Sequence, residues 1–255
     1  MRFLPVLRLP LAATDYAGAV EWIKDVALAG DRAYAVAAAN THLASLARHD
    51  PDFMRTMELF DINFPDGMPL VWAMNHRLPH DQQLKDRVYG PTLMLETMKS
   101  TAGDPRFSHY LLGGKESTLE KLRANLPSRI PGIAIAGTYS PPFGAWSADE
   151  TKRIFERIRD SKANLIWIGF GCPKQETWIA THKKELPPAV YFGIGAAFAF
   201  HAGEVAQAPP WIQSCGMEWL FRLCAEPRRL FKRYVTYNSL FLWYSLGDLG
   251  IRKAP

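Results

Sequence analysis

Residues 61–67 read Asp-Ile-Asn-Phe-Pro-Asp-Gly, and this short stretch decides how the rest of the chain is interpreted. The apolar run from Ile62 to Phe64 predicts a buried strand, and the Pro-Asp-Gly that ends it is a turn signal. The carboxylate of Asp66 is therefore expected on a tight loop beyond the carboxyl end of a strand, where open α/β sheets bind ligands. The alternative is that Asp66 only caps the helix predicted to begin near Met68.

Strand and helix patterns alternate along most of the chain. Short apolar runs, each followed by a segment with helical spacing, predict buried strands at residues 33–38, 110–112, 133–137, 165–168 and 190–192. An additional edge strand is expected at residues 6–9. This alternation predicts an α/β fold with a doubly wound, mostly parallel, Rossmann-like sheet and right-handed crossovers.

The C-terminal part differs in kind, because from Trp211 onward the sequence is helical, aromatic and basic, with Pro227 interrupting the pattern. We predict an α/β core over residues 1–203 and a helical appendage over residues 204–255. After residue 210 the chain has seven basic and three acidic residues, a net charge of +4 out of +5. A basic, aromatic, amphipathic helix is typical of binding to an anionic membrane surface. Packing of this helix on the core or on a dimer partner is an equal alternative, and a homo-oligomer is compatible with the sequence.

Composition excludes several classes of protein. A hydrophobic content of 48% and a charged content of 22% are ordinary for a globular protein. Three cysteines without framework spacing predict free thiols in a reducing compartment. No signal peptide or membrane span is recognisable, so a cytoplasmic protein is expected. Nucleic-acid binding is not expected, because the positive charge is concentrated in one short appendage without a nucleic-acid motif.

Glycine-rich turns follow three of the predicted strands. At Gly169-x-Gly171 and Gly193-x-Gly195, backbone N–H groups could approach a phosphate. Position 198, where a dinucleotide-binding loop would have its third glycine, is Phe198, which argues against a nucleotide-dependent oxidoreductase. Together with Asp66, Arg87 and Gln175, the turns could hold a nucleoside diphosphate and deprotonate a hydroxyl, although spacing alone does not single out that reaction.

Metal-binding patterns are weak, and neither a metal nor a cofactor is expected. Asp50-Pro51-Asp52 matches a metal-binding Asp-x-Asp, but a proline at the first helical position explains it as a helix start capped by Asp50. His76 and His80 are separated by Pro79, which breaks the helix that would bring them together. Asn40 and Thr41 open another helix, where either one is an N-cap or a ligand group.

Several motifs in order resemble the WecG/TagA/CpsF glycosyltransferases, glycosyltransferase family 26. The resemblance runs from Asn40 to Tyr234, nearly the whole chain. The motifs are Asn40, Pro65-Asp66-Gly67, Arg87-Val88-Tyr89-Gly90, Gly171-Cys172-Pro173-Lys174-Gln175-Glu176, Ala208-Pro209-Pro210-Trp211-Ile212-Gln213, and Met217-Glu218-Trp219-Leu220-Phe221-Arg222-Leu223 with Glu226-Pro227-Arg228-Arg229-Leu230.

The resemblance implies an inverting, metal-independent transfer of a sugar from a UDP-sugar to a polyprenyl-pyrophosphate-linked acceptor. The reaction would take place peripherally on the cytoplasmic face of a bacterial membrane, in cell-surface polysaccharide synthesis. An N-acetylmannosamine-type donor is favoured, and a glucose donor or a non-enzymatic lipid- or nucleic-acid-binding module is the alternative. Asp66 is the implied general base. The implied substrate-binding residues are Asn40, Thr41, Arg87, Gln175, Gly169, Gly171, Gly193, Gly195, Arg222, Arg229 and Lys232.

Three positions depart from the family pattern. Ala38 stands where a threonine is typical, Ala199 where an aspartate is typical, and Gln207 where an arginine is typical. These departures concern recognition of the donor. Asp66 and Arg87 are retained, so an active enzyme is expected.

Overall fold

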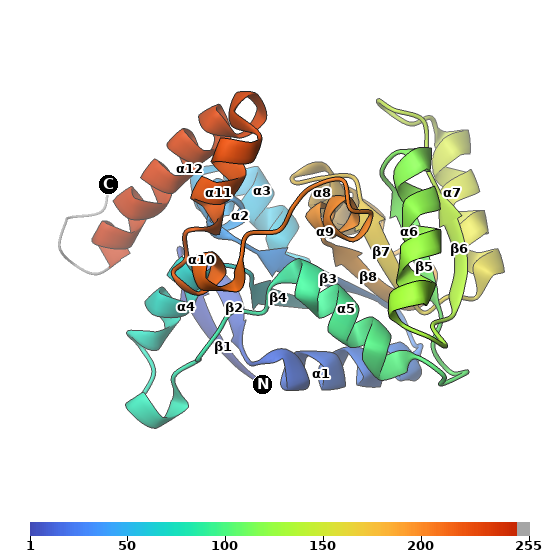
Figure 1. Cartoon of the computed structure of the whole chain (residues 1–255), viewed down its shortest axis with the longest axis horizontal. Helices are drawn as coiled ribbons and strands as arrows, with labels where there is room; N and C mark the ends of the chain where they lie inside the picture. Colours follow the sequence, from blue (N-terminus) through green and yellow to red (C-terminus); the bar gives the residue numbers. More distant parts are fainter. Residues whose placement is uncertain (249–255) are drawn as a thin grey trace. The chain divides into compact units, whose positions relative to one another are not determined.

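The computed structural model of the protein describes residues 1–248, without the side chains of Pro210, Ser214 and Arg229. Its main sheet has six strands in the order β4-β3-β8-β7-β5-β6 (Figure 1). The pairs β3–β8, β8–β7, β7–β5 and β5–β6 are all parallel. The predicted α/β class with a Rossmann-like parallel sheet is confirmed. The strands are β3 (Ala33–Ala39), β4 (Ile62–Pro65), β5 (His109–Gly113), β6 (Ile135–Tyr139), β7 (Leu165–Gly169) and β8 (Ala189–Gly193).

The chain folds into two compact units. The first unit contains Met1–Asp15, Ala38–Tyr89 and the chain from Gln207 onward, and the second contains Tyr16–Ala37 and Gly90–Ala206. The proposed boundary near residue 203 between a core and an appendage stays a prediction.

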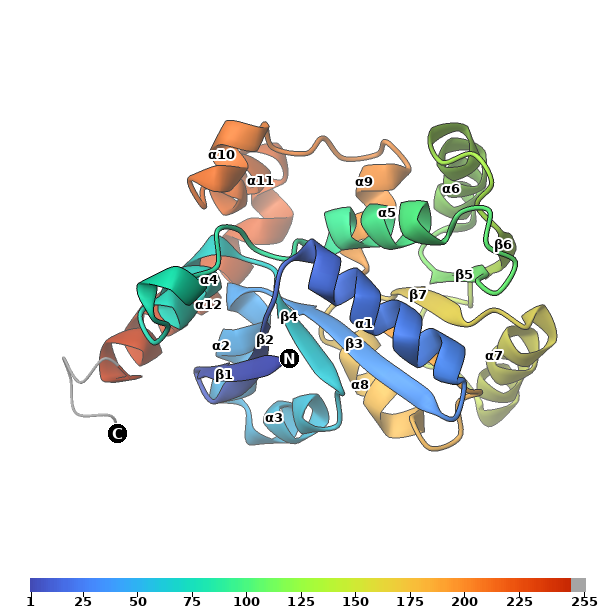
Figure 2. The ribbon, with the colours of Figure 1, turned by 90° about the horizontal axis from the view of Figure 1, so that it is seen from below.

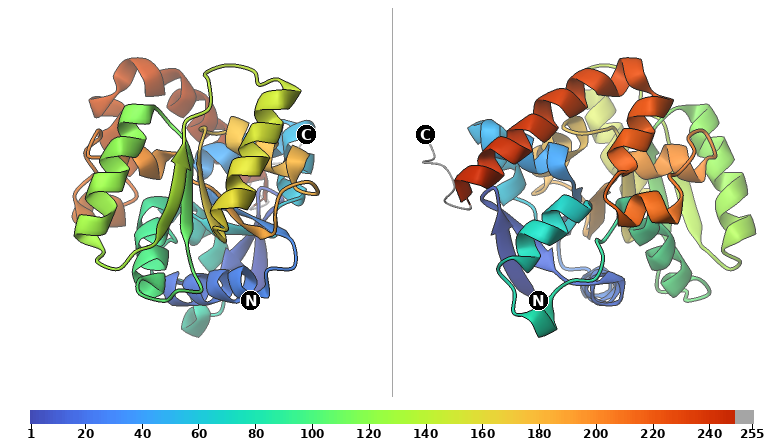
Figure 3. Two further views of the ribbon diagram at one scale, coloured as in Figure 1. Left: turned by 90° about the vertical axis from the view of Figure 1, so that its right-hand side faces the viewer. Right: turned by 60° about the vertical axis from the view of Figure 1, so that its left-hand side comes forward.

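The second unit has a layer of helices on either side of its strands, as Figure 3 (left) shows for β5 and β6 between α6 and α7. Residues of β5 and β8 are buried throughout, because parallel strands are covered on both faces. Trp167 of β7 stacks on Phe192 of β8 with ring centres 3.9 Å apart. The helices are α1 (Tyr16–Ala29), α5 (Gly90–Thr101), α6 (Glu116–Arg129), α7 (Ala148–Ser161), α8 (Lys174–His182) and α9 (Ala196–His201).

A buried histidine is integrated into this core. The indole N–H of Trp167 donates to Nδ1 of His109 at 3.0 Å, and Nε2 of His109 lies 3.0 Å from the hydroxyl oxygen of Thr101. Burial lowers the pKa of His109 to about 3. The ring is therefore neutral at physiological pH, with its proton on Nε2.

The first unit begins with an antiparallel hairpin, β1 (Arg2–Val6) and β2 (Leu9–Ala13), in which Val6 faces Leu9. The edge strand expected at residues 6–9 is therefore wrong, since Leu7 and Arg8 form the two-residue turn with φ of 50° and 71°. The hairpin packs beside β4 through β2 (Figure 2). The amide of Asn63 donates to the carbonyl of Pro10 at 3.2 Å and supports this contact.

Helices complete the first unit: α2 (Thr41–His49), α3 (Pro51–Glu58), α4 (Met68–Asn75), the 3₁₀ turn η1 (His80–Gln82), α10 (Pro210–Ser214), α11 (Glu218–Ala225) and α12 (Pro227–Asp248). The break between α11 and α12 falls at Pro227, as predicted. Helix α12 runs along α2 (Figure 3, right). His42 packs edge-on against Tyr237 with ring centres 4.3 Å apart, and His49 Nδ1 lies 3.0 Å from the Tyr244 hydroxyl.

Side chains cap the starts of α3 and α7, and one of these caps is the predicted Asp50. The carboxylate of Asp50 accepts from the N–H groups of Asp52 and Phe53 at the start of α3. Ser147 accepts from the N–H of Glu150 at the start of α7.

None of the helices that can be traced through residue 248 is long and apolar enough to cross a membrane. None of the three cysteines, Cys172, Cys215 and Cys224, forms a disulfide, as their spacing predicted.

Candidate active site

Asp66 lies directly after the carboxyl end of β4, as the sequence predicts. All four residues of β4 are buried, and the N–H of Asp66 donates to the carbonyl of Ala39 at 2.8 Å. The N-cap position of α4 is occupied by Gly67. Asp66 itself is half-buried and lines a cavity.

This cavity, which we call the Asp66 cavity, measures about 100 Å³ and is formed entirely by the first unit. Sites for whole drug-sized ligands are usually about 300–1,000 Å³, so this one fits the reacting part of a larger substrate. It brings together five sequence-predicted residues: Asn40, Thr41, Asp66, Arg87 and Arg222. Its other lining residues are His42, Gly67, Met68, Pro69, Tyr89, Gly216, Glu218, Trp219, Arg233 and Tyr234.

Asn40 has a structural task in addition to its place at the cavity. It is the N-cap residue of α2, and its side-chain oxygen accepts from the N–H of Leu43 at 3.1 Å. The next residue, Thr41, donates from its hydroxyl to the side-chain oxygen of Asn238 on α12 at 3.3 Å. The start of α2 is thus tied to the C-terminal helix beside Asp66.

Arg87 is anchored at the cavity wall by groups from three segments. Its Nη2 donates to Glu218, with which it forms an ion pair, and to the side-chain oxygen of Gln213 at 3.0 Å. Its Nη1 donates to the backbone carbonyl of Asp66 at 3.3 Å. Burial alone would lower the pKa of Arg87, but the carboxylates of Glu218 and Asp66 outweigh it and raise that pKa above its ordinary value. Arg87 therefore stays charged and holds the Asp66 loop in place.

Glu218 is a site residue that sequence reasoning did not single out. It lies in the first turn of α11, where a negative charge is favoured by the helix dipole. Besides pairing with Arg87, it accepts a 2.6 Å hydrogen bond from the hydroxyl of Tyr89. Burial and the Glu218 carboxylate raise the pKa of Tyr89, which keeps the phenol protonated as a donor. The one available signal was the acidic residue inside the mainly apolar and aromatic Met217-to-Arg222 motif.

Two arginines of the C-terminal helices complete the lining. Arg222 of α11 was predicted and Arg233 of α12 was not. Arg233 lies one helical turn after Arg229, whose side chain is outside the described part of the chain. Lys232 is exposed and is not among the lining residues. Burial and the charge of Arg233 lower the pKa of His42 to about 4, so this ring is neutral.

The cavity therefore combines three guanidinium groups with two carboxylates. The carboxylate of Glu218 is engaged with Arg87, whereas Asp66 occupies the turn after β4. An acid beside a surplus of arginine charge can accept a proton while the surroundings stabilise a developing anion.

The glycine turns of the second unit gather around Gln175, which is 4% exposed. Its side-chain oxygen accepts from the N–H groups of Gly171 and Gly195, both at 3.1 Å, and its amide donates to Glu176 at 2.8 Å. A Cβ at position 195 would lie 2.7 Å from this oxygen, so close packing of the two turns requires glycine there. Gly171, with φ +80°, has open space where a Cβ would point. Gln175 thus fixes the turns after β7 and β8 to each other.

The chain was compared with models of known protein families. The model of the glycosyl transferase WecG/TagA/CpsF family matches residues 4–254. The chain belongs to this family. The resemblance drawn from the motifs is confirmed, and the protein is a glycosyltransferase of cell-surface polysaccharide synthesis.

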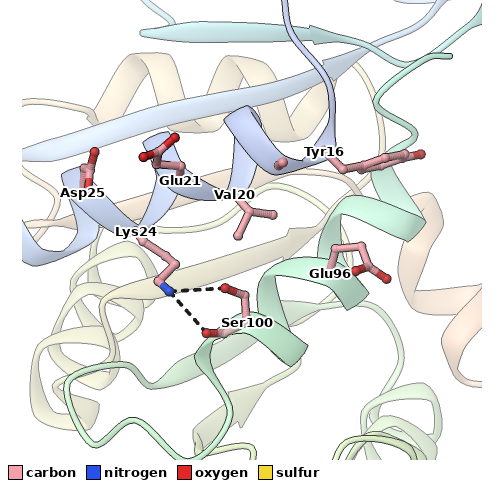
Figure 4. A pocket seen from close by; sticks show the side chains of 8 residues that line it. Tyr16, Val20, Glu21, Lys24, Asp25, Glu96 and Ser100 are labelled. Atoms are coloured by element: carbon pink, nitrogen blue, oxygen red, sulfur yellow. Dashed lines mark hydrogen bonds between the residues drawn. The ribbon is translucent and has the colours of Figure 1, made fainter. Parts of the chain in front are cut away.

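The second unit of the glycosyltransferase contains a further hollow of about 610 Å³ between α1 and α5. In Figure 4, Lys24 reaches across it to Ser100, with the ammonium nitrogen 3.4 Å from the carbonyl oxygen and 3.3 Å from the hydroxyl oxygen. Its other lining residues are Tyr16, Ala17, Val20, Glu21, Asp25 and Glu96, and none of the predicted site residues of the glycosyltransferase is among them.

Metal-ligating residues do not cluster within residues 1–248 of the glycosyltransferase, where no group of three or more His, Cys, Asp or Glu side chains could hold an ion. His76 is exposed and is the C-cap residue that follows α4, and His80 opens η1.

Proposed function

We propose that this glycosyltransferase transfers a sugar, N-acetylmannosamine-type ahead of glucose, from a UDP-sugar to a hydroxyl of a polyprenyl-pyrophosphate-linked acceptor. The observation that carries the proposal is the grouping of Asp66 with Arg87, Arg222 and Arg233 around one cavity. Family membership supports glycosyl transfer, and the surplus of arginine charge supports substrates that carry diphosphates.

In the proposed reaction Asp66 is the general base. Its carboxylate accepts the proton of the acceptor hydroxyl as the new bond from that oxygen to the anomeric carbon forms. The bond from the anomeric carbon to the diphosphate oxygen breaks on the opposite face, so the configuration inverts and UDP leaves as an anion. The acceptor oxygen must come within about 2.6–3.2 Å of the carboxylate for this transfer.

The arginines have different tasks in this proposal. Arg222 and Arg233 stabilise diphosphate charge, since a guanidinium can bind two phosphate oxygens at once. Arg87, which is already engaged with Glu218 and Gln213, mainly positions the Asp66 loop. Gln175 acts indirectly on the donor by holding the turns at Gly171 and Gly195.

A panel of UDP-sugars tests the proposal. Purified protein is incubated with each donor and a sugar-pyrophosphate acceptor that has a lipid tail, and released UDP and the anomeric configuration of the product are measured. We expect acceptor-dependent UDP release from one donor with inversion. A product with retained configuration, or no turnover with any donor, would overturn the proposal.

The exposed face of α11 and α12 supports peripheral binding at the cytoplasmic face of the membrane. Basic residues of α12 lie on this face together with exposed large apolar side chains. The apolar side chains are Trp219, Leu220, Phe231, Val235, Leu242, Trp243 and Leu246. We expect sedimentation with vesicles that contain anionic lipid, weakened by salt because surface charge is screened. Equal binding to neutral vesicles would contradict the electrostatic part.

A further inference from the structure

A second cavity of the first unit adjoins the Asp66 cavity. It measures about 560 Å³, and we call it the α4–α12 groove. It shares three lining residues, Thr41, Pro69 and Trp219, with the Asp66 cavity. Its other lining residues are Val6, Leu7, Trp72, Ala73, His76, Arg77, Asn238, Phe241, Leu242, Ser245 and Asp248.

The two compartments have opposite chemistry. The α4–α12 groove is walled mainly by apolar side chains from the hairpin turn, α4, α11 and α12. The polar groups near its shared end are engaged, since the hydroxyl of Thr41 donates to the side chain of Asn238. The Asp66 cavity, in contrast, has three arginines and two carboxylates. A ligand that matches both is an amphiphile with an anionic head and a long apolar tail.

Exposure along the groove also favours an apolar occupant. Trp72 is 52% exposed and Leu242 is 64% exposed, although both line a cavity. Leaving such side chains in water is unfavourable, and covering them with hydrocarbon recovers their burial free energy. The volume lies within the range of small-molecule sites, so it fits the first part of a long tail rather than the whole of it.

We propose that the α4–α12 groove binds the first isoprene units of the acceptor's tail, next to the diphosphate. This inference rests on the proposed function, because it assigns the tail of that acceptor. The groove then orients the acceptor hydroxyl toward Asp66 and recognises the part of the tail that lies next to the diphosphate. A second copy of the chain and unspecific contact with the membrane are the competing occupants.

Binding of prenyl diphosphates tests the groove without any transfer chemistry. Isothermal titration calorimetry compares isopentenyl diphosphate with farnesyl diphosphate below its micelle concentration. Burying one methylene contributes roughly fourfold in affinity, so even partial burial of the longer tail predicts binding at least about tenfold tighter. Equal dissociation constants for the two ligands would overturn the proposal.

Filling the groove gives a sharper comparison. Ala73→Phe, on α4, should remove the affinity advantage of the longer tail and leave the affinity for isopentenyl diphosphate unchanged. Ala17→Phe is the matched control, because Ala17 lines the hollow between α1 and α5 in the other unit and the variant should change the affinity for neither ligand. If both variants lose the affinity advantage of the longer tail, or if neither does, the proposed tail binding in the groove is contradicted.

A second pair of variants guards against misfolding of Ala73→Phe and separates the groove from the membrane. Leu242 and Leu246 are both exposed on α12, but Leu242 alone of the two lines the groove. Leu242→Ser should weaken the binding of farnesyl diphosphate at least about fivefold more than Leu246→Ser does. Equal effects would assign the preference to unspecific surface contact, and tail-dependent dimerisation by ultracentrifugation would assign it to a second copy.

Failure of the groove and failure of the proposed function give different results. If UDP is released with short- and long-tailed acceptors at the same KM, the proposed sugar transfer is supported and tail binding in the groove is refuted. If no acceptor supports UDP release, but farnesyl diphosphate binds more tightly than isopentenyl diphosphate and Ala73→Phe removes this difference, tail binding in the groove is supported and the proposed transfer is refuted.

Discussion

Replacing Glu218 by glutamine removes the charge that holds Arg87 and keeps nearly the same shape. The side chains of this pair are each 8% exposed, so Arg87 would remain as a buried cation with two neutral acceptors, Gln213 and the carbonyl of Asp66. Breaking a buried ion pair from one side costs about 3–5 kcal/mol. Because the two neutral acceptors remain, we expect the lower end, about 3 kcal/mol.

The loss can be measured by urea unfolding followed through tryptophan fluorescence and by thermal unfolding. For a chain of this size about 3 kcal/mol corresponds to a fall in Tm of roughly 6–12 °C. Glu218→Ala should lose about 1–3 kcal/mol more, because it also removes the acceptor of the Tyr89 hydroxyl. The matched control is Glu116→Gln, an exposed glutamate in the first turn of α6, which should stay within about 0.5 kcal/mol of the wild type.

A double-mutant cycle separates the pair from its surroundings. Arg87→Met combined with Glu218→Gln leaves no buried unpaired charge, so the double variant should lose less than the sum of the single losses by at least about 1 kcal/mol. Additive losses, or a loss below about 1 kcal/mol for Glu218→Gln, would refute the view that this pair fixes the start of α11 to the Asp66 loop.

Three further results are expected from the rest of the molecule. Gly195→Ala should destabilise by about 1–3 kcal/mol in urea unfolding and raise the KM for the donor, since its Cβ would crowd the side chain of Gln175; wild-type values would contradict the close packing. Gln175→Leu should do the same by removing the acceptor of two loop N–H groups, whereas unchanged donor binding would exclude its positioning role. Stability should fall as pH drops from about 6.5 toward 4, because His42 and His109 have lowered pKa values and the unfolded chain binds protons that the folded one does not. Each contributes at most about 1.4 kcal/mol per pH unit, and a flat profile of unfolding free energy would contradict their neutral burial.

Local patterns were sufficient to predict the sheet and the position of Asp66. Apolar runs such as Ile62 to Phe64 are buried strands because parallel strands are covered on both faces, and a turn signal after such a run places Asp66 at its carboxyl end. The N-terminal hairpin was missed because its turn, Leu7-Arg8, has two positive φ angles without the glycine or asparagine that normally marks such a turn.

Contacts between distant residues were beyond the reach of sequence patterns. Glu218 accepts hydrogen bonds from Arg87 and Tyr89, which lie 131 and 129 positions away in the chain, and no local spacing predicts such contacts. Arg233 was not predicted and Lys232 was, because a basic run does not show which of its side chains lines the cavity. The α4–α12 groove likewise exists only once the hairpin turn, α4 and α12 are folded together.

The central claim, that Asp66 takes the proton of the acceptor hydroxyl, is tested most directly by UDP release from Asp66→Asn. Asp61→Asn is the matched control, a half-buried aspartate before the other end of β4. A general base contributes about 10²–10⁴-fold, so kcat of Asp66→Asn should fall by at least about 100-fold, with unchanged Tm and an unchanged KM for the donor, while Asp61→Asn stays within about twofold. A kcat for Asp66→Asn close to that of Asp61→Asn would contradict the account.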